Sequence, residues 1–212
     1  MSSPIGLTEG FGKLKVAKQV ALIARWHAKA VDLGTQLLAL SCFDHNRFVE
    51  RCNAIEDDVM SFQSLDLEFT AEVIDVLHEY CFILRKLIER TDKVEQAKQL
   101  LPHAGQETAT IDKGGIDDKE MRLCTESLWW ILGRIIHSRA VMVLGGDASN
   151  LIVYADGKTR EYSDGRCYVE VSSDFDDAGQ SHVIHVPSLV RAYMFSAMSR
   201  EIQEIVRANT LR

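Results

Sequence analysis

The spacing of apolar residues divides this chain into a long helical part and a short β part. From about residue 11 to residue 138, apolar side chains recur every three or four positions, which is the spacing of one face of an α-helix. Between residues 141 and 186 they recur every second position, in short runs separated by Gly-Gly and Asp-Gly turns. The helical spacing then returns from Pro187 to about Ala208. Because every helix must bury its apolar stripe, the pattern predicts a helical bundle with a β insert before the last helix.

The predicted fold is therefore mainly α: a four- to five-helix bundle with a small antiparallel β-hairpin or meander at about residues 140–186. Helices are expected over the ranges 11–40, 44–62, 66–90 with a short continuation at 94–101, 117–138 and 187–208. The stretch 102–116 is rich in Gly, Thr and Gln, so we expect a flexible loop there. Neither side of this loop has an apolar core of its own. We therefore predict a single domain over residues 1–212, a length that permits one continuous core.

Composition and charge argue against several classes of protein. Apolar residues make up 46% and charged residues 26% of the chain, both close to the globular average. Charged residues interrupt the longest apolar candidate, 17–42, and the N-terminus lacks the pattern of a secretory signal, so no membrane association is expected. The 5 cysteines include no Cys-x-x-Cys pair, which indicates reduced thiols in a cytoplasmic protein and no structural zinc. The net charge of -7 argues against a surface that coats nucleic acid, but it leaves room for a local basic patch.

Residues 129–139, Trp-Trp-Ile-Leu-Gly-Arg-Ile-Ile-His-Ser-Arg, are the most distinctive segment. Arg134 and His137 are three positions apart, so a helix places them on one face. An imidazole exchanges protons near neutral pH, and a guanidinium holds a phosphate or stabilises developing negative charge. These side chains suit metal-independent RNA cleavage, in which the 2′-hydroxyl attacks the adjacent phosphate. The candidate catalytic residues are therefore His137, with Arg134 or Arg139 for the phosphate.

An Ile-Ile-His137-Ser sequence at the end of a late helix, followed by a β excursion and a terminal helix, resembles the HEPN superfamily over the C-terminal half of the chain. The resemblance implies a helical bundle, commonly dimeric, whose active members are ribonucleases of toxin and phage-defence systems. Their signature places four to six residues between an Arg and the His, whereas residue 132 is Leu and Arg134 leaves only two. The resemblance therefore implies an interaction or regulatory module that forms a homodimer, in a toxin–antitoxin or phage-defence type of system. A ribonuclease is the alternative, with RNA as its partner.

The same segment also has a purely structural interpretation. Trp129 and Trp130 then serve for packing, and Arg134 pairs with an acidic neighbour such as Glu126 or Glu120. His137 lies near a helix C-terminus, where the helix dipole favours an imidazolium whatever its role.

His27 and Tyr193 complete the set of candidate binding residues. His27 interrupts the apolar stripe of the first helix, where it is either a hydrogen-bonded core histidine or a proton-transfer partner of His137. Tyr193, with Trp129 and Trp130, would line a pocket for a small molecule, which is a third hypothesis. The edges of the short strands offer a site for a protein partner. No cofactor or metal is expected, because the sequence contains no P-loop, dinucleotide-binding or His-Glu-x-x-His motif.

Overall fold

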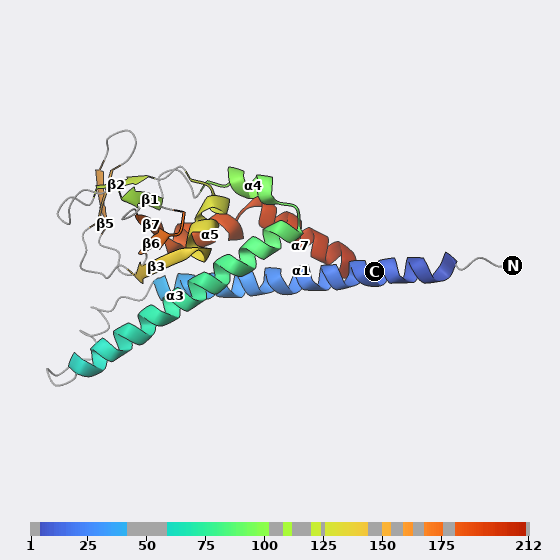
Figure 1. Ribbon diagram of the computed structural model, residues 1–212, viewed down its shortest axis with the longest axis horizontal. Helices are drawn as coiled ribbons and strands as arrows, with labels where there is room; N and C mark the ends of the chain where they lie inside the picture. The colour runs from blue at the N-terminus through green and yellow to red at the C-terminus, as the bar shows by residue number, and fades with distance from the viewer. Residues whose placement is uncertain are drawn as a thin grey trace.

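The computed structural model describes residues 5–41, 59–101, 108–111, 120–123, 126–143, 150–153, 159–162, 168–175 and 181–210. Within these residues the protein is mainly helical, and a mostly antiparallel sheet precedes the last helices, as the periodicity predicts (Figure 1). The helices are α1 (Ile5–Ser41), α3 (Val59–Arg90), α4 (Val94–Gln99), α5 (Leu128–Ile136), α6 (Val186–Met194) and α7 (Ala197–Thr210). The strands are β1 (Thr108–Ile111), β2 (Glu120–Leu123), β3 (Ser138–Val143), β4 (Asn150–Val153), β5 (Thr159–Tyr162), β6 (Tyr168–Ser173) and β7 (Ser181–His185). None of the described helices is both long and apolar enough to cross a membrane.

The core lies where the two longest helices, α1 and α3, cross (Figure 1). Ala30 and Leu37 are two turns apart on α1, and Leu77 and Leu84 are two turns apart on α3; all four are fully buried. Burying one leucine side chain contributes roughly 1.5–3 kcal/mol relative to leaving it in water. α6 and α7 pack on α1, and α5 packs on α3. These buried residues belong to the predicted apolar stripes, so periodicity locates the core correctly.

The sheet is larger than the predicted insert. Its strand order is β3-β6-β7-β1-β2-β4-β5. β3, β6 and β7 pair antiparallel next to the last helices. The pairs β1–β7, β1–β2 and β4–β5 are also antiparallel, and β2 pairs with β4 in parallel. Two of the strands, β1 and β2, come before α5 in the chain. The prediction that all strands follow residue 140 is therefore wrong.

The sequence interpretation is also wrong about the chain just before α5. The helix predicted for 117–138 begins only at Leu128, and the loop predicted for 102–116 contains a strand at 108–111. The sequence of β2, Glu-Met-Arg-Leu, alternates polar and apolar residue types, which is the period of a strand and not that of a helix. Ser127 then starts the helix, because its hydroxyl oxygen accepts a hydrogen bond from the Trp130 N–H at 3.3 Å.

The last predicted helix, 187–208, is two helices in the structure. The break comes at Ser196, whose hydroxyl donates to the carbonyl of Tyr193 at 2.7 Å and accepts from the N–H of Ser199 at 3.1 Å. One serine thus ends α6 and caps α7. The helix predicted for 44–62 lies mostly outside the described residues, and its residues from Val59 onward belong to α3.

Candidate functional site

The candidate site is built on the outer face of α5. Its inner face is the buried set Leu128, Ile131, Leu132 and Ile135, which packs against α3 and the sheet. The other residues of α5 are only partly buried: Trp129, Trp130 and Ile136 pack against the core, and Gly133 and Arg134 lie beside them. The strong amphipathic pattern of this nine-residue helix therefore separates the fully buried side chains from those that solvent reaches.

Arg134 lies over two aromatic rings. Its guanidinium carbon is 4.5 Å from the centre of the Trp130 ring and 5.4 Å from the centre of the Phe175 ring. Nη1 donates a hydrogen bond to the Ser173 hydroxyl oxygen at 3.1 Å. The same oxygen accepts from the N–H of Phe175 at 3.2 Å. The turn after β6 is therefore tied to Arg134, and cation–π contact adds roughly 0.5–1 kcal/mol at an exposed site of this kind.

A second arginine comes from α3. The guanidinium carbon of Arg85 lies 4.5 Å from the centre of the Trp129 ring. Its Nε also lies 3.4 Å from Glu89 on the next turn of α3. Gly133 makes room for this arrangement, because a Cβ at that position would stand 3.2 Å from Nη1 of Arg85.

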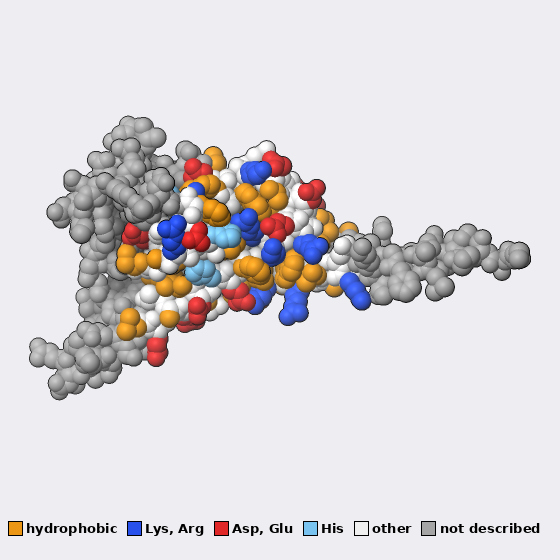
Figure 2. Space-filling model, in the orientation of Figure 1, with side chains coloured by type: hydrophobic (Ala, Val, Ile, Leu, Met, Phe, Trp, Pro, Cys, Tyr) orange, Lys and Arg blue, Asp and Glu red, His pale blue; other side chains and the backbone are white. Residues whose placement is uncertain are grey.

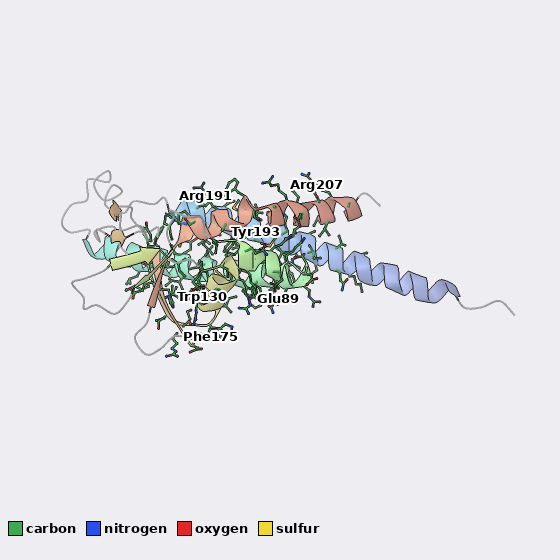
Figure 3. All side chains as sticks on the ribbon, turned by 90° about the horizontal axis from the view of Figure 1, so that it is seen from above. Glu89, Trp130, Phe175, Arg191, Tyr193 and Arg207 are labelled. Carbon is green, nitrogen blue, oxygen red and sulfur yellow. The ribbon has the colours of Figure 1, made fainter. Side chains whose placement is uncertain are left out.

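These contacts surround an open groove of about 510 Å³. It is lined by cations, aromatic rings, one carboxylate and two small residues: Arg85, Lys98, Arg134, Trp129, Trp130, Phe175, Glu126, Ser127 and Gly133. In Figure 3, Trp130 and Phe175 lie on the side of the molecule away from Arg191. The groove carries more positive than negative side chains in a chain whose net charge is -7. On the face drawn in Figure 2, Lys and Arg side chains alternate with hydrophobic ones over the crossing helices.

The three predicted catalytic residues all contact one turn, Asp174–Phe175. The ring of His137 meets the ring of Phe175 edge-on, with centres 4.9 Å apart and planes at 70°. The carbonyl oxygen of His137 accepts from the N–H of Asp174 at 3.0 Å. Arg139 donates from Nε to a carboxylate oxygen of Asp174 at 2.8 Å and from Nη2 to its carbonyl oxygen at 3.3 Å. With Arg134 over Phe175, the turn joins three residues that lie close together in sequence.

His137 and Arg139 are nevertheless placed differently from Arg134. His137 is exposed at the C-terminal end of α5, and Arg139 forms an exposed ion pair with Asp174. Neither lines the groove, whereas Arg134 does.

His27 and Tyr193 pair with each other inside the bundle. Nδ1 of His27 and the hydroxyl of Tyr193 are 2.7 Å apart, which joins α1 to α6. Burial lowers the pKa of His27 and raises the pKa of Tyr193, so both side chains are neutral near pH 7. Tyr193 is fully buried and does not line the groove that Trp129 and Trp130 form. Of the two interpretations of His27, the hydrogen-bonded core histidine describes this contact.

Three groove residues from outside the segment 126–134, Arg85, Lys98 and Phe175, were not among the sequence candidates. They come from other elements, and no local spacing relates them to α5. In the part of the chain that the structure describes, no three His, Cys, Asp or Glu side chains gather as a metal site would require.

Comparison with known proteins identifies no relative: no family model, curated protein or solved structure matches the chain. The HEPN resemblance of the C-terminal half therefore stays a prediction.

Proposed function

We propose that the groove over α5 binds a phosphate ester that carries an aromatic base, namely a nucleotide, either free or within a single strand of RNA. The observation that carries this proposal is the position of Arg134 over the rings of Trp130 and Phe175 at the wall of an open groove. Such a binding role is compatible with the interaction or regulatory module that the HEPN resemblance implies.

The charges of the groove favour an anionic ligand. Arg85, Lys98 and Arg134 contribute three positive charges, and Glu126 contributes one negative charge. Each cation also has a partner within the protein: Lys98 lies 2.7 Å from Glu95, Arg85 lies near Glu89, and Arg134 bonds to Ser173. A guanidinium presents several N–H donors in one plane, so it can hold a phosphate and keep its contact with a ring.

The aromatic rings favour a ligand that also has a flat face. Trp129, Trp130 and Phe175 surround the groove, and 62% of Phe175 is exposed to solvent. Stacking of one base on an aromatic side chain contributes roughly 1–3 kcal/mol in single-strand binding proteins. The volume of about 510 Å³ also lies within the range of small-molecule sites.

Binding is tested by fluorescence anisotropy with a short, labelled single-stranded RNA and with AMP as an unlabelled competitor. Arg134→Ala is expected to weaken binding by roughly tenfold or more, which corresponds to ~1.4 kcal/mol. Arg134→Lys keeps the charge but lacks the planar guanidinium, so we expect an intermediate loss. Competition by AMP indicates a site for one nucleotide, whereas RNA binding that AMP does not compete for indicates a strand.

Arg191→Ala is the matched control, because Arg191 is an exposed arginine on the side of the molecule away from Trp130 and Phe175 (Figure 3). The affinity of this variant for RNA should stay within about twofold of that of the unmodified protein. Equal losses for Arg191→Ala and Arg134→Ala would mean that general surface charge, not the groove, binds the ligand.

A metal-independent ribonuclease is a second candidate, favoured by the contact of both His137 and Arg134 with the ring of Phe175. The imidazole would exchange the proton of the 2′-hydroxyl, and the guanidinium would hold the phosphate. Cleavage of mixed RNA in the presence of EDTA, lost in His137→Ala, is the expected result. If the purified chain leaves RNA intact, or if His137→Ala cleaves at the same rate, this second function is refuted.

A further inference from the structure

A second group of reactive side chains lies at the start of β3. The hydroxyl of Ser138 is 2.9 Å from Nε2 of His78, which α3 contributes. Nδ1 of His78 lies 3.0 Å from the carbonyl oxygen of Ile74, one turn earlier on α3. Ser138 and His78 come from segments 60 positions apart, so the fold creates this pair.

The carbonyl of Ile74 fixes the tautomer of the neutral imidazole. A carbonyl oxygen can only accept a hydrogen bond, so Nδ1 carries the proton and donates it. Nε2 then presents its lone pair to Ser138, whose hydroxyl donates. In an activated serine nucleophile, the hydroxyl donates to one nitrogen of an imidazole, and a third group holds the imidazole in place through its other nitrogen. Ser138, His78 and the carbonyl of Ile74 have this arrangement.

The backbone next to Ser138 departs from a regular ladder. The β3–β6 register pairs Ser138 with Ser173 and Ala140 with Ser172, so Arg139 is the extra residue of a bulge. The backbone N–H after a serine nucleophile is a common donor to the negatively charged oxygen of an acyl-transfer intermediate. Arg139 occupies that position, and the Arg134 guanidinium adds positive charge one strand away through its bond to Ser173.

A second serine–histidine pair shows what the same contact looks like in a structural role. Nδ1 of His185 lies 2.8 Å from the hydroxyl of Ser188, at the start of α6. Ser188 is 95% buried, with only 5% of its surface accessible, and no substrate could reach it. Ser138 and His78 are both only partly buried.

We propose that Ser138 is a nucleophile activated by His78 and that it cleaves carboxylic esters with a short acyl group. The partial burial of both side chains favours a small acyl group. Neither Ser138 nor His78 lines the nucleotide-binding groove, although Arg134 lies near both sites.

The chemistry balances without a cofactor. The oxygen of Ser138 forms a bond to the acyl carbon, its proton moves to Nε2 of His78, and the carbonyl electron pair moves onto oxygen. Collapse of this intermediate breaks the bond to the alkoxy group, which takes the proton from Nε2 and leaves as the alcohol. Water then attacks acyl-Ser138, giving a proton to Nε2, and the carboxylic acid leaves as Ser138 regains its proton. The net reaction is hydrolysis of the ester.

The test is covalent labelling of the purified full chain with a fluorophosphonate probe, followed by mass spectrometry of its peptides. We expect one label per chain on Ser138, none in Ser138→Ala, and labelling at least roughly tenfold slower in His78→Ala. Ser188→Ala is the control and should be labelled at the unmodified rate. Because peptide mapping of the unmodified protein locates the label directly, the identification of Ser138 does not depend on how well a variant folds, and circular dichroism checks that His78→Ala is folded before its labelling rate is compared. Absence of a label at Ser138, or a rate that His78→Ala does not change, would overturn the proposal.

Discussion

Replacing Gly34 by alanine is expected to destabilise the fold, although alanine is the better helix former. Gly34 lies inside α1, where this substitution alone would contribute about 1 kcal/mol in favour of the helix. A Cβ at this position would stand 3.1 Å from Cγ1 of Val190, 3.2 Å from the sulfur of Met194 and 3.3 Å from Cε2 of Tyr80. These distances are shorter than ordinary contacts between carbon atoms. The close approach of α1 to α6 and α3 therefore depends on the missing side chain.

The size of the effect follows from two opposing contributions, the crowding around the new methyl group and the higher helix propensity of alanine. Val190 and Tyr80 are fully buried and cannot retreat without moving their own neighbours. Adding a methyl group to a well-packed core costs about 1–3 kcal/mol. After subtraction of the gain in helix propensity, we expect a net loss of about 1 kcal/mol, which lowers the melting temperature of a chain of this length by about 2–4 °C.

Gly133→Ala is the matched control, because it makes the same change inside α5 where only the end of a flexible side chain is near. Its Cβ would meet Nη1 of Arg85 at 3.2 Å, and that guanidinium can move toward solvent. The gain of about 1 kcal/mol in helix propensity then meets a loss of roughly 0.5–1 kcal/mol from the Arg85–Trp129 contact. Thermal unfolding followed by circular dichroism should therefore show Gly133→Ala unchanged or slightly stabilised. If Gly34→Ala raises the melting temperature as much as Gly133→Ala does, the close helix packing described here is refuted.

Three further predictions concern stability and assembly. Asp92 has a φ of 56° in the turn after α3. Asp92→Gly should therefore relieve backbone strain and stabilise the fold by roughly 0.5–1 kcal/mol. Urea unfolding measures this change, and an unchanged midpoint would contradict it. Burial and, to a lesser extent, the charge of Arg191 lower the pKa of His185 to about 4. Below pH 6.5 the unfolded chain therefore binds a proton at His185 more readily than the folded chain does. The free energy of unfolding should fall as the pH decreases from about 6.5 toward 4. Urea unfolding at pH 7 and at pH 5 should show a smaller loss of stability between the two pH values for His185→Asn than for the unmodified protein. An equal loss in both proteins would exclude His185 as the source of the pH dependence. Light scattering should report the homodimer that the HEPN resemblance implies, and a strictly monomeric chain at micromolar concentration would contradict it.

Long apolar stripes were the part of the fold that could be predicted from sequence. Leu77 and Leu84 show why: a helix of many turns repeats its spacing often enough to identify the buried face. β1 and β2 are four residues each, and a run of that length carries too few repeats to distinguish a strand from a loop or helix. β1 pairs with β2, the next strand in the chain, but also with β7, which is distant in the chain and which no local pattern could reveal.

The candidate site also has one part that could be predicted from the sequence and one part that could not. Trp129, Trp130 and Arg134 lie on one short helix, so their common face follows from local spacing. Arg85 and Phe175 reach the groove only because α3 and the turn after β6 fold against α5. No spacing within the sequence relates them to α5, so only three of the nine residues that line the groove could be predicted as candidates. The Ser138–His78 contact was beyond sequence reasoning for the same reason.

The most direct test of nucleotide binding uses the tryptophans of the groove as reporters. The chain contains 3 tryptophans, so Trp26→Phe leaves Trp129 and Trp130 as the sources of tryptophan emission. Titration of this variant with AMP or a short single-stranded RNA should change the emission in a saturable way. Adding Arg134→Ala should move the midpoint to a ligand concentration roughly tenfold higher or more. A signal that does not change with either ligand, or a midpoint that Arg134→Ala leaves in place, would contradict a nucleotide site in the α5 groove.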